Sequence, residues 1–303
     1  MYIVRFHGGL GNQICEYIFY RYFEELLKKR DPDAVLRADL TWFERNCKVH
    51  QGYELERVFG IRLPAADYAE IARVHEYYPR YHKLMPLRVL SRKFAAMKNA
   101  HNKPTGEHIY DFGESCYRYN PIYESLDTDK DWYIEGVFCT DEYLDRIKDV
   151  VLKELVFVPA DNDEDIEILD RMGREESVAL HVRRGDYSGT VFDVVTVDYY
   201  KRAVEYIRER VKDPVFYVFS DDVEYIDKNF AFLGDRRMIH HSGKSSFRDM
   251  QFISGCKHKI IANSTFSFCA AMLGEAEDGI IIAPAKYKAD EDIVMAREHW
   301  VKL

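Results

Sequence analysis

The sequence predicts an α/β protein of two domains, each built around a parallel β-sheet. A strand, a glycine-rich turn and a helix open the chain, and strands alternate with helices through its second half. The 303 residues also exceed what a single hydrophobic core, roughly 250–300 residues at most, usually serves. We expect an N-terminal domain over residues 1–160 and a C-terminal domain over residues 161–303, joined near the acidic stretch 159–165.

The N-terminal domain is expected to begin with a strand at residues 2–6, which are rich in β-branched and aromatic side chains. Apolar residues at helical spacing predict a helix over residues 14–29, and Asp31-Pro32-Asp33 ends it. Residues 40–130 contain five prolines and show no clear periodicity, so we expect an irregular helical insert there. The other elements expected in this domain are strands at 35–38 and 132–138 and a helix at 140–155.

The C-terminal domain shows a more regular alternation of short apolar runs and helical patterns. Strands that alternate with helices predict a parallel sheet with right-handed crossovers. The expected strands are 177–182, 215–219, 237–240, 259–262 and 279–283, and the expected helices are 197–211, 222–229, 247–255 and 264–273.

Composition and charge limit the classes of function. Hydrophobic residues make up 47% and charged residues 31% of the chain, which is typical of a globular protein with a substantial core. The formal net charge of -9 argues against non-specific binding to nucleic acid or to an anionic membrane. If the ligand is an anion, a few arginines must be concentrated against the overall charge.

Cysteine usage and hydropathy indicate a protein of the cytoplasm. The six cysteines form no C-x-x-C pair and no cluster with zinc-site spacing, so we expect free thiols in a reducing compartment. The chain contains no apolar run of about 18 residues, so no membrane span is expected. The first residues also lack the long apolar stretch of a signal peptide.

The first motif is the turn Gly8-Gly9-Leu10-Gly11-Asn12-Gln13, which lies between the first strand and the first helix. Glycines let the backbone approach a ligand, and the N-terminus of the following helix can bind an anion. We expect Gly9, Gly11, Asn12 and Gln13 to bind substrate. A purely structural tight turn is about as well supported, because the string matches neither a G-x-G-x-x-G fingerprint nor a P-loop.

The second motif, His181-Val182-Arg183-Arg184-Gly185-Asp186-Tyr187, follows the expected strand 177–182. Ligands of open α/β sheets bind beyond the carboxyl ends of the strands. One arginine can pair with Asp186, and the other can hold a pyrophosphate through two parallel hydrogen bonds. A structural network of ion pairs is the alternative interpretation.

The third and fourth motifs follow two further strands of the same domain. Ser220-Asp221-Asp222 offers carboxylates that can accept hydrogen bonds from a base, coordinate a metal or cap the next helix. Asn263-Ser264-Thr265-Phe266-Ser267 offers hydroxyl groups that can bind phosphate or cap a helix. Capping is the simpler interpretation of each motif alone, but a cleft that combines the three C-terminal motifs would suit a nucleoside diphosphate.

The four motifs, in this order, resemble those of the α-1,2-fucosyltransferase family, and the string over residues 256–267 is the most specific. The resemblance implies a GT-B-like fold of two Rossmann-like domains with GDP-fucose in the cleft between them and the acceptor on the side of residues 1–160. It assigns the β-phosphate to Arg183, supported by Arg184. The other roles that the resemblance implies are guanine binding by Asp221 or Asp222, phosphate binding by Ser264, Thr265 or Ser267, and substrate contacts by His181 and Asn263.

The resemblance also implies the reaction: transfer of L-fucose from GDP-β-L-fucose to the 2-hydroxyl of a galactose-terminated glycan, with inversion, in O-antigen or capsule biosynthesis. No metal or other cofactor is expected, because D-x-D strings such as Asp163-Glu164-Asp165 follow no apolar strand and are interpreted as solvated turns. Candidates for a general base are Asp186, which we expect to be catalytic together with Arg183, and also His7 and Glu16.

This chain departs from the family pattern at two places. Cys15 and Glu16 stand where Phe-Gln is typical, and the string after residue 267 lacks the usual tryptophans and glycine. Acceptor preference and linkage therefore stay open, as do two alternatives: a related sugar transferase with another donor or linkage, and a non-catalytic protein that binds a nucleotide sugar. The basic, aromatic residues 73–92 could contact a membrane that carries a lipid-linked acceptor, although a solvated or packed helical segment explains them as well.

Overall fold

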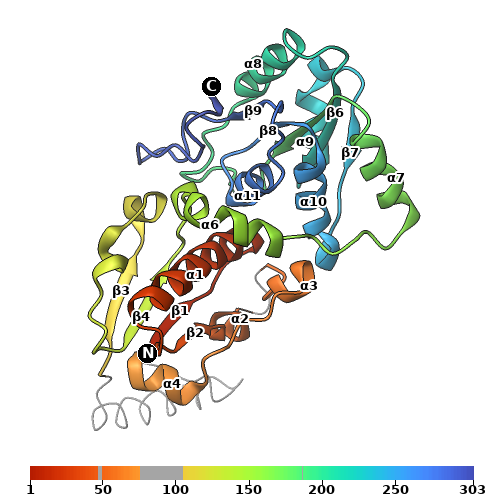
Figure 1. Cartoon of the computed structure of the whole chain (residues 1–303). Helices are drawn as coiled ribbons and strands as arrows, with labels where there is room; N and C mark the ends of the chain where they lie inside the picture. Colours follow the sequence, from red (N-terminus) through yellow and green to blue (C-terminus); the bar gives the residue numbers. More distant parts are fainter. Residues whose placement is uncertain (47–49, 76–104, 186) are drawn as a thin grey trace, which may run out of the picture. The chain divides into compact units, whose positions relative to one another are not determined.

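The structure, a computed structural model, describes residues 1–46, 50–75, 105–185 and 187–303 (Figure 1). The chain divides into two compact units. Unit 1 comprises Met1–Glu56 and Ile61–Val151, and unit 2 comprises Arg57–Gly60 and Leu152–Leu303.

Unit 1 contains a four-stranded sheet in which all neighbouring strands are parallel. Its spatial order is β2-β1-β4-β3, so the chain passes from β1 to β2 on one side, crosses to the opposite edge at β3 and returns to β4 beside β1. The order reverses between β1 and β4, and such a reversal is where open α/β sheets bind ligands beyond their carboxyl ends. The strands are β1 (Tyr2–Arg5), β2 (Leu36–Asp39), β3 (Glu107–Asp111) and β4 (Trp132–Gly136).

Helix α1 (Leu10–Arg30) covers one face of this sheet through aromatic contacts. The ring of Phe19 stacks on Phe138 at 3.8 Å, and Phe23 meets Tyr2 of β1 edge to face at 5.3 Å. The other face packs on α4 (Tyr68–Val74), whose Ile71 and Val74 form a cluster with Ile3 of β1 and Tyr133 of β4. Alternate residues of β1 therefore serve the two faces, as a strand buried on both sides requires.

The first helix begins at Leu10, four residues before the predicted start. Only Gly8 and Gly9 are needed for the turn, because Gly8 adopts a φ of +76° and Gly9 is the N-cap in an extended conformation. A Cβ atom at Gly8 would lie 2.6 Å from Nδ2 of Asn12, so this position also lacks space for a side chain. Gly11, Asn12 and Gln13 are consequently part of the helix rather than of the turn.

The expected irregular region contains one strand that the sequence analysis missed, β3. Its sequence EHIYD is mostly polar, and four of its five side chains are exposed or half-buried, so it lacks the apolar run by which strands are recognised. Residues 47–49 and 76–104 lie outside the described residues. The remaining elements are α2 (Thr41–Arg45), α3 (Leu55–Phe59), α6 (Asp141–Glu154) and 3₁₀ turns at Gly113–Tyr117 and Pro121–Ser125.

Unit 2 contains a six-stranded parallel sheet in the order β10-β9-β8-β5-β6-β7. When the strands are numbered along the chain from β5 and read from the β7 edge, the order is 3-2-1-4-5-6, which is the strand order of the Rossmann fold. The order reverses between β5 and β8. The strands are β5 (Ser177–Val182), β6 (Val215–Ser220), β7 (Arg237–Ile239), β8 (His258–Ile260), β9 (Ile281–Ala283) and β10 (Val301–Lys302).

Helices cover both faces of this sheet (Figure 1). Val178, Leu180 and Val182 of β5 pack with α8 and α9 in one core cluster, while α10 contacts β5, α7 and α11 in the opposite layer. The predicted elements of this half are present with ends shifted by at most three residues. The helices are α7 (Asp163–Met172), α8 (Val197–Arg208), α9 (Val223–Asn229), α10 (Phe247–Gly255) and α11 (Thr265–Leu273), with 3₁₀ turns at Ala231–Leu233 and Gly243–Ser245.

The sequence analysis missed β10 and α7. The string Asp163-Glu164-Asp165 is the first turn of α7 rather than a solvated turn, because the side chain of Asn162 caps the helix by accepting from the backbone N–H of Asp165. Acidic side chains in a first turn interact favourably with the helix dipole. The two parallel sheets confirm the α/β class and its two Rossmann-like parts. Among the described residues, no helix is both long and apolar enough to cross a bilayer.

A half-buried histidine with two carboxylate partners, His241, links three segments of unit 2. Nδ1 of His241 lies 2.6 Å from Oδ1 of Asp249 on α10, and Nε2 lies 3.1 Å from Oδ1 of Asp165 on α7. The hydrogen bond to Asp249 raises the pKa of His241, and burial raises the pKa of Asp249. Both shifts mean that the folded state holds protons more tightly than the unfolded state does.

We therefore predict that the stability contributed by His241 is present below its unfolded pKa of about 6.5 and is lost as the pH rises through its higher folded pKa. His241→Gln should lower the free energy of unfolding by about 1 kcal/mol or more at pH values near 6, and by less near pH 8. Chemical denaturation at the two pH values checks this. The matched control is His299→Gln at an exposed site, and an equal loss for His241→Gln at both pH values would contradict the prediction.

Candidate functional site

Three of the four motifs meet at one edge of the unit 2 sheet. β5 leads into Arg183 and Arg184, β6 into Asp221, and β8 into the segment that begins α11. These strands are direct neighbours in the order β8-β5-β6, and because they are parallel their carboxyl ends lie at the same edge. The second and fourth motifs flank the reversal of strand order between β5 and β8, which is the expected ligand position in a Rossmann fold.

Asp221 organises the arginine loop. Its Oδ2 lies 3.0 Å from Nη1 of Arg183, and its Oδ1 accepts a hydrogen bond of 2.9 Å from the backbone N–H of Arg184. A Cβ atom at Gly185 would approach Oδ2 of Asp221 to 2.7 Å, so the loop needs glycine there. Asp221 is thus an ion-pair partner of Arg183. Asp186, the partner expected for one arginine, lies outside the described residues, and its catalytic role stays a prediction.

Arg184 contacts residues on both sides of the loop. Its Nη1 lies 2.7 Å from Oδ1 of Asp193, and its guanidinium lies 4.4 Å from the ring centre of Tyr225 on α9. The side chain is 22% exposed, against 33% for Arg183. This geometry fits the supporting role predicted for Arg184, because the residue braces the loop that presents Arg183.

The two aspartates of the third motif have different roles. Asp222 is the N-cap of α9, where its Oδ1 accepts a hydrogen bond of 2.9 Å from the backbone N–H of Tyr225. The capping interpretation is therefore confirmed for Asp222. Asp221 is the carboxylate that faces the arginines, so it is the better candidate for contact with a ligand.

Three polar side chains of the fourth motif form hydrogen bonds within the protein. Ser264 caps α11 by accepting from the backbone N–H of Phe266 at 3.3 Å, and Ser267, which is fully buried, donates its hydroxyl to the carbonyl of Ala262. Asn263 donates to the carbonyls of Phe192 and Tyr287 at 2.8 and 2.6 Å. The capping interpretation thus applies to Ser264, and Asn263 and Ser267 serve as braces instead of the predicted substrate ligands. Half-buried Thr265 is the first residue of α11.

His181 lies behind this edge and is 6% exposed. Its Nδ1 has no hydrogen-bond partner among the described residues, and its ring lies 5.8 Å from that of Phe266. Burial, reinforced by the nearby charge of Arg183, lowers the pKa of His181 to about 4. The imidazole is therefore neutral at physiological pH and does not repel the arginine loop.

In unit 1 the structure corrects the role expected for Gln13. The side chain is fully buried, and its amide donates to the carbonyls of Gly8 and Gly52 at 3.1 and 2.9 Å. Its Oε1 accepts a hydrogen bond of 2.8 Å from the backbone N–H of Glu54. Gln13 thus binds the glycine turn to the loop 50–54 rather than a substrate. Gly9 and Gly11 lie beside it, at the N-cap and in the first turn of α1.

His7 and Glu16 form a pair at the carboxyl end of β1, in which Glu16 is fully buried and His7 is half-buried. Nδ1 of His7 lies 2.6 Å from Oε1 of Glu16, and the backbone N–H of His7 donates to both carboxylate oxygens at 3.2 and 3.0 Å. Two aromatic residues that the sequence analysis did not single out, Trp42 and Phe112, have ring centres 6.3 and 5.6 Å from that of His7. Trp42 is the second residue of α2, and Phe112 directly follows β3. Only the tertiary structure reveals that both lie near His7.

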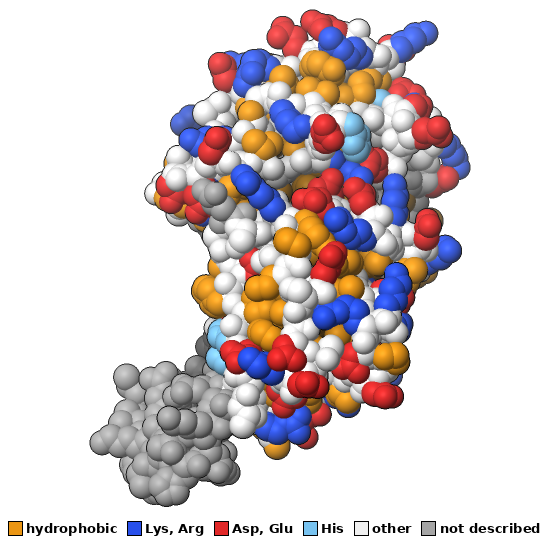
Figure 2. All heavy atoms as spheres, turned by 60° about the vertical axis from the view of Figure 1, so that its left-hand side comes forward, with side chains coloured by type: hydrophobic (Ala, Val, Ile, Leu, Met, Phe, Trp, Pro, Cys, Tyr) orange, Lys and Arg blue, Asp and Glu red, His pale blue; other side chains and the backbone are white. Residues whose placement is uncertain are grey.

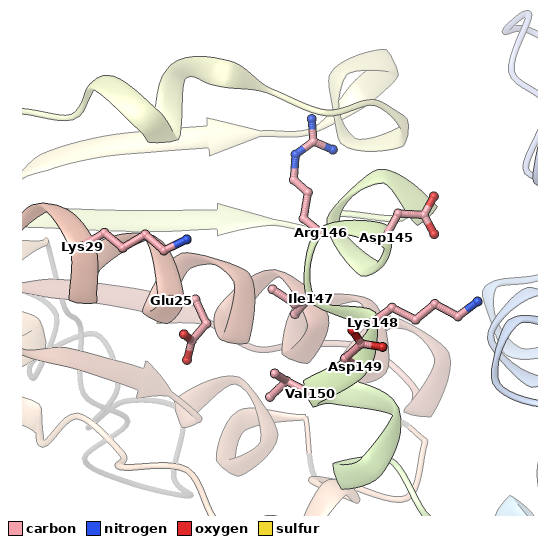
Figure 3. A pocket seen from close by; sticks show the side chains of 8 residues that line it. All are labelled: Glu25, Lys29, Asp145, Arg146, Ile147, Lys148, Asp149 and Val150. Atoms are coloured by element: carbon pink, nitrogen blue, oxygen red, sulfur yellow. The ribbon is translucent and has the colours of Figure 1, made fainter.

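A shallow pocket elsewhere in unit 1 contains none of the predicted site residues (Figure 3). It has a volume of about 250 Å³ and lies between α1 and α6, beside the kink at Ile147. Acidic and basic side chains are balanced around it, which gives no preference for an ion of either sign. Its lining residues are Glu25, Lys29, Asp145, Arg146, Ile147, Lys148, Asp149 and Val150.

The described parts of the chain show no metal site, and the face displayed in Figure 2 shows no surface of a single charge sign. In those described parts, no group of three or more His, Cys, Asp or Glu residues is arranged to hold a metal ion. On the face that Figure 2 displays, acidic and basic side chains are mixed across the coloured residues. Metal independence and the absence of nucleic-acid partners stay predictions.

Comparisons with solved structures return fucosyltransferases at low identity. The α-1,6-fucosyltransferase NodZ soaked with GDP-fucose shares 13% identity, with a TM-score of 0.49 over 90% of this chain and 92% of that chain. NodZ from Bradyrhizobium, as its selenomethionine form, shares 13% identity with a TM-score of 0.49 over 90% of this chain and 91% of that one.

Sequence comparisons are more informative because two relatives match over the full length. The O-antigen biosynthesis glycosyltransferase WbnK of Escherichia coli is 28% identical over 98% of both chains. An alpha-1,2-colitosyltransferase of Escherichia coli is 26% identical over 99% of this chain and 98% of the relative. A mouse galactoside 2-alpha-L-fucosyltransferase, Sec1, is 29% identical over 55% of this chain and 46% of its own. The model of glycosyl transferase family 11 matches residues 77–303, and the chain therefore belongs to that family.

Proposed function

We propose that the protein transfers L-fucose from GDP-β-L-fucose to the 2-hydroxyl of a galactose-terminated glycan, with inversion and without a metal ion. The observation that carries this proposal is the placement of Arg183 and Asp221 beside the start of α11, at the reversal of strand order in a Rossmann sheet. This edge offers a cation for phosphate and a carboxylate for a base with N–H donors. Membership of glycosyl transferase family 11 supports the class of reaction.

Arg183 would stabilise the leaving group. As the bond between fucose C1 and the β-phosphate oxygen breaks, negative charge grows on the phosphate, and a guanidinium already in place stabilises it without reorganisation. The contact with Asp221 orients Arg183, and the brace at Arg184 holds the loop. The acceptor oxygen attacks C1 from the opposite side, so a β-linked donor yields an α-linked product.

A second candidate is transfer of colitose, the 3-deoxy counterpart of fucose, from its GDP-linked form. This candidate rests on the full-length match to a colitosyltransferase, because the fucosyltransferase relatives match over only about half of the chain or less. A site that hydrogen-bonds the 3-hydroxyl would reject colitose strongly, whereas an apolar site would discriminate only weakly. Donor comparison distinguishes the two.

The setting of the reaction is also a proposal. We place the enzyme in the cytoplasm, with peripheral contact to the inner face of the membrane through a lipid-linked acceptor. Residues 76–92 of the basic segment that would make this contact lie outside the described residues. A non-catalytic nucleotide-sugar-binding protein is the remaining alternative, and formation of a glycoside product excludes it.

We predict acceptor-stimulated release of GDP from GDP-fucose in the presence of EDTA. Lactose, N-acetyllactosamine and Galβ1-3GalNAc serve as acceptors, and NMR of the product identifies an α-1,2 linkage. Turnover that disappears in EDTA would contradict metal independence. Turnover with GDP-colitose alone would replace the fucosyl proposal by the colitosyl one, and binding of GDP-fucose without any product would favour the non-catalytic alternative.

A further inference from the structure

The carboxyl edge of the unit 1 sheet carries its own cluster of residues. β1, β2 and β3 are followed within three residues by His7, Trp42 and Phe112 respectively, and the strands are parallel, so these residues gather at one edge. The reversal of strand order lies between β1 and β4, directly beside His7. Unit 1 therefore has a ligand edge of the same topological kind as unit 2, but without a pair of arginines in a loop.

The contacts of His7 orient its ring. Glu16 is fully buried on α1, and its carboxylate accepts hydrogen bonds from the backbone N–H of His7. Its Oε1 lies 2.6 Å from Nδ1 of His7, an ion-pair contact that lacks the alignment of a hydrogen bond. The His7 side chain is 17% exposed, and no described residue forms a hydrogen bond with its Nε2. A histidine with one ring nitrogen held by a carboxylate presents the other nitrogen in a defined tautomer and orientation.

We propose that His7 is the general base that accepts the proton of the acceptor hydroxyl, and that Glu16 is the positioning residue that orients His7 and stabilises its charged form. This assignment rests on the proposed transferase function. It gives a role to a histidine that follows a strand end and to a fully buried glutamate.

The transfer step forms one bond and breaks another. The acceptor oxygen forms a bond to C1 of the donor sugar, and the bond from C1 to the β-phosphate oxygen breaks, with its electron pair leaving on GDP. The hydroxyl proton moves to Nε2 of His7, which becomes an imidazolium paired with the carboxylate of Glu16. Water then takes the proton from Nε2 after the products leave, and the starting state is restored.

The aromatic neighbours suit a sugar acceptor. The rings of Trp42 and Phe112 flank His7 at 6.3 and 5.6 Å, and Tyr110, with its side chain 67% exposed, lies 4.3 Å from Phe112. Aromatic side chains offer large, rigid apolar surfaces that suit the C–H face of a pyranose. A neutral glycan, rather than an anion, is the ligand that this edge favours.

The charges around the pair predict the pH dependence. Burial lowers the pKa of His7, but the Glu16 carboxylate more than offsets this, so the pKa is raised. Burial raises the pKa of Glu16 to about 7, against the effect of His7 and helped slightly by Cys15. Arg5 of β1 acts to lower the pKa of His7, and Glu135 of β4 acts to raise it. Activity should therefore rise with pH as the pair loses its proton, above the usual range of an isolated histidine.

Glu16→Gln removes the negative charge of the pair while its amide oxygen can still accept one hydrogen bond from the backbone N–H of His7. The variant lacks the negative charge that raises the pKa of His7. In a plot of kcat/KM against pH, the rise on the acid side, or acid limb, should therefore move to lower pH, and the value on the plateau should fall. A purely structural role of Glu16 would change stability but leave the position of the acid limb unchanged.

His7→Gln is expected to lower kcat for transfer by about 10²-fold or more, the range of general-base catalysis, with the KM for GDP-fucose unchanged. Glutamine keeps an N–H donor for Glu16, and thermal unfolding checks that the chain is folded. The matched control is His108→Gln on β3, whose side chain lies 3.6 Å from Glu135 and should retain nearly full activity.

The outcomes separate the two proposals. A folded His7→Gln enzyme with nearly wild-type kcat, or an acid limb that Glu16→Gln does not move, overturns the base assignment while the transferase function stands. A wild-type chain that transfers no sugar from any GDP-sugar to any acceptor contradicts the transferase function itself, and with it this assignment.

Discussion

Replacing Arg183 with alanine is expected to reduce kcat/KM for fucosyl transfer by about 10²- to 10³-fold, the loss typical of removing one preorganised electrostatic contact. In the proposed reaction the charge on the departing GDP develops at the carboxyl edge where the strand order reverses between β5 and β8, and Arg183 is the more exposed of the two loop arginines there. The fold should survive, because Asp221 keeps its hydrogen bond from the backbone of Arg184.

Steady-state kinetics and thermal unfolding together check this prediction. Arg183→Lys keeps the positive charge but not the planar fork, so an intermediate loss is expected. Arg210→Ala removes an exposed arginine that pairs with its neighbour Glu209 and serves as the matched control. A folded Arg183→Ala enzyme with nearly wild-type turnover would remove Arg183 from the mechanism.

Most of the C-terminal half, apart from α7 and β10, could be predicted closely from sequence because its two longest strands are mostly apolar and two of the predicted helices have local side-chain caps. All six residues of β5 are buried, as expected for a strand covered on both faces, and such runs stand out in a sequence. Asp222 and Ser264 mark helix starts with side chains that act within three residues. Local information was therefore enough to place these elements.

The N-terminal half was less predictable because its signals depend on tertiary contacts. β3 is a polar edge strand that is stabilised by pairing with β4. The start of α1 at Leu10 depends on the conformation of Gly8 and Gly9, whereas the apolar periodicity becomes clear only from residue 14. Periodicity reports burial, so it does not reveal helix turns that are held by backbone geometry alone.

The sequence singled out three motifs that the structure places at one edge of the unit 2 sheet, but it did not reveal the partners of their residues. Arg183 and Asp221 lie 38 residues apart and meet because β5 and β6 are neighbours in register, a fact that no local pattern contains. His7 and Glu16 were both candidate bases, and only the packing of α1 on β1 shows that the two side chains form an ion pair. In the same way, the sequence predicted that the amide of Gln13 binds a substrate. In the structure this amide forms hydrogen bonds with the loop 50–54.

Gln13→Leu tests that last correction and should have the largest effect on stability of the changes proposed. Leucine has a similar volume but no polar atoms, so the carbonyls of Gly8 and Gly52 and the N–H of Glu54 lose their partners in a buried region. Each unsatisfied buried group costs about 1–3 kcal/mol, which gives a loss of roughly 3 kcal/mol or more. In a unit of this size the Tm should fall by about 6–12 °C.

Calorimetry and GDP titration distinguish the two roles of Gln13. If Gln13 is a brace, Gln13→Leu lowers the Tm while the folded protein binds GDP as the wild type does, because the predicted donor contacts belong to unit 2. If Gln13 is a ligand, the Tm stays and affinity or turnover falls. Gln51→Leu, at an exposed position beside the same loop, controls for the loss of an amide and should change neither. A brace between the glycine turn and the loop 50–54 also sets the backbone of His7, so a lower kcat without weaker GDP binding would link the stability of this turn to the proton-accepting edge of unit 1.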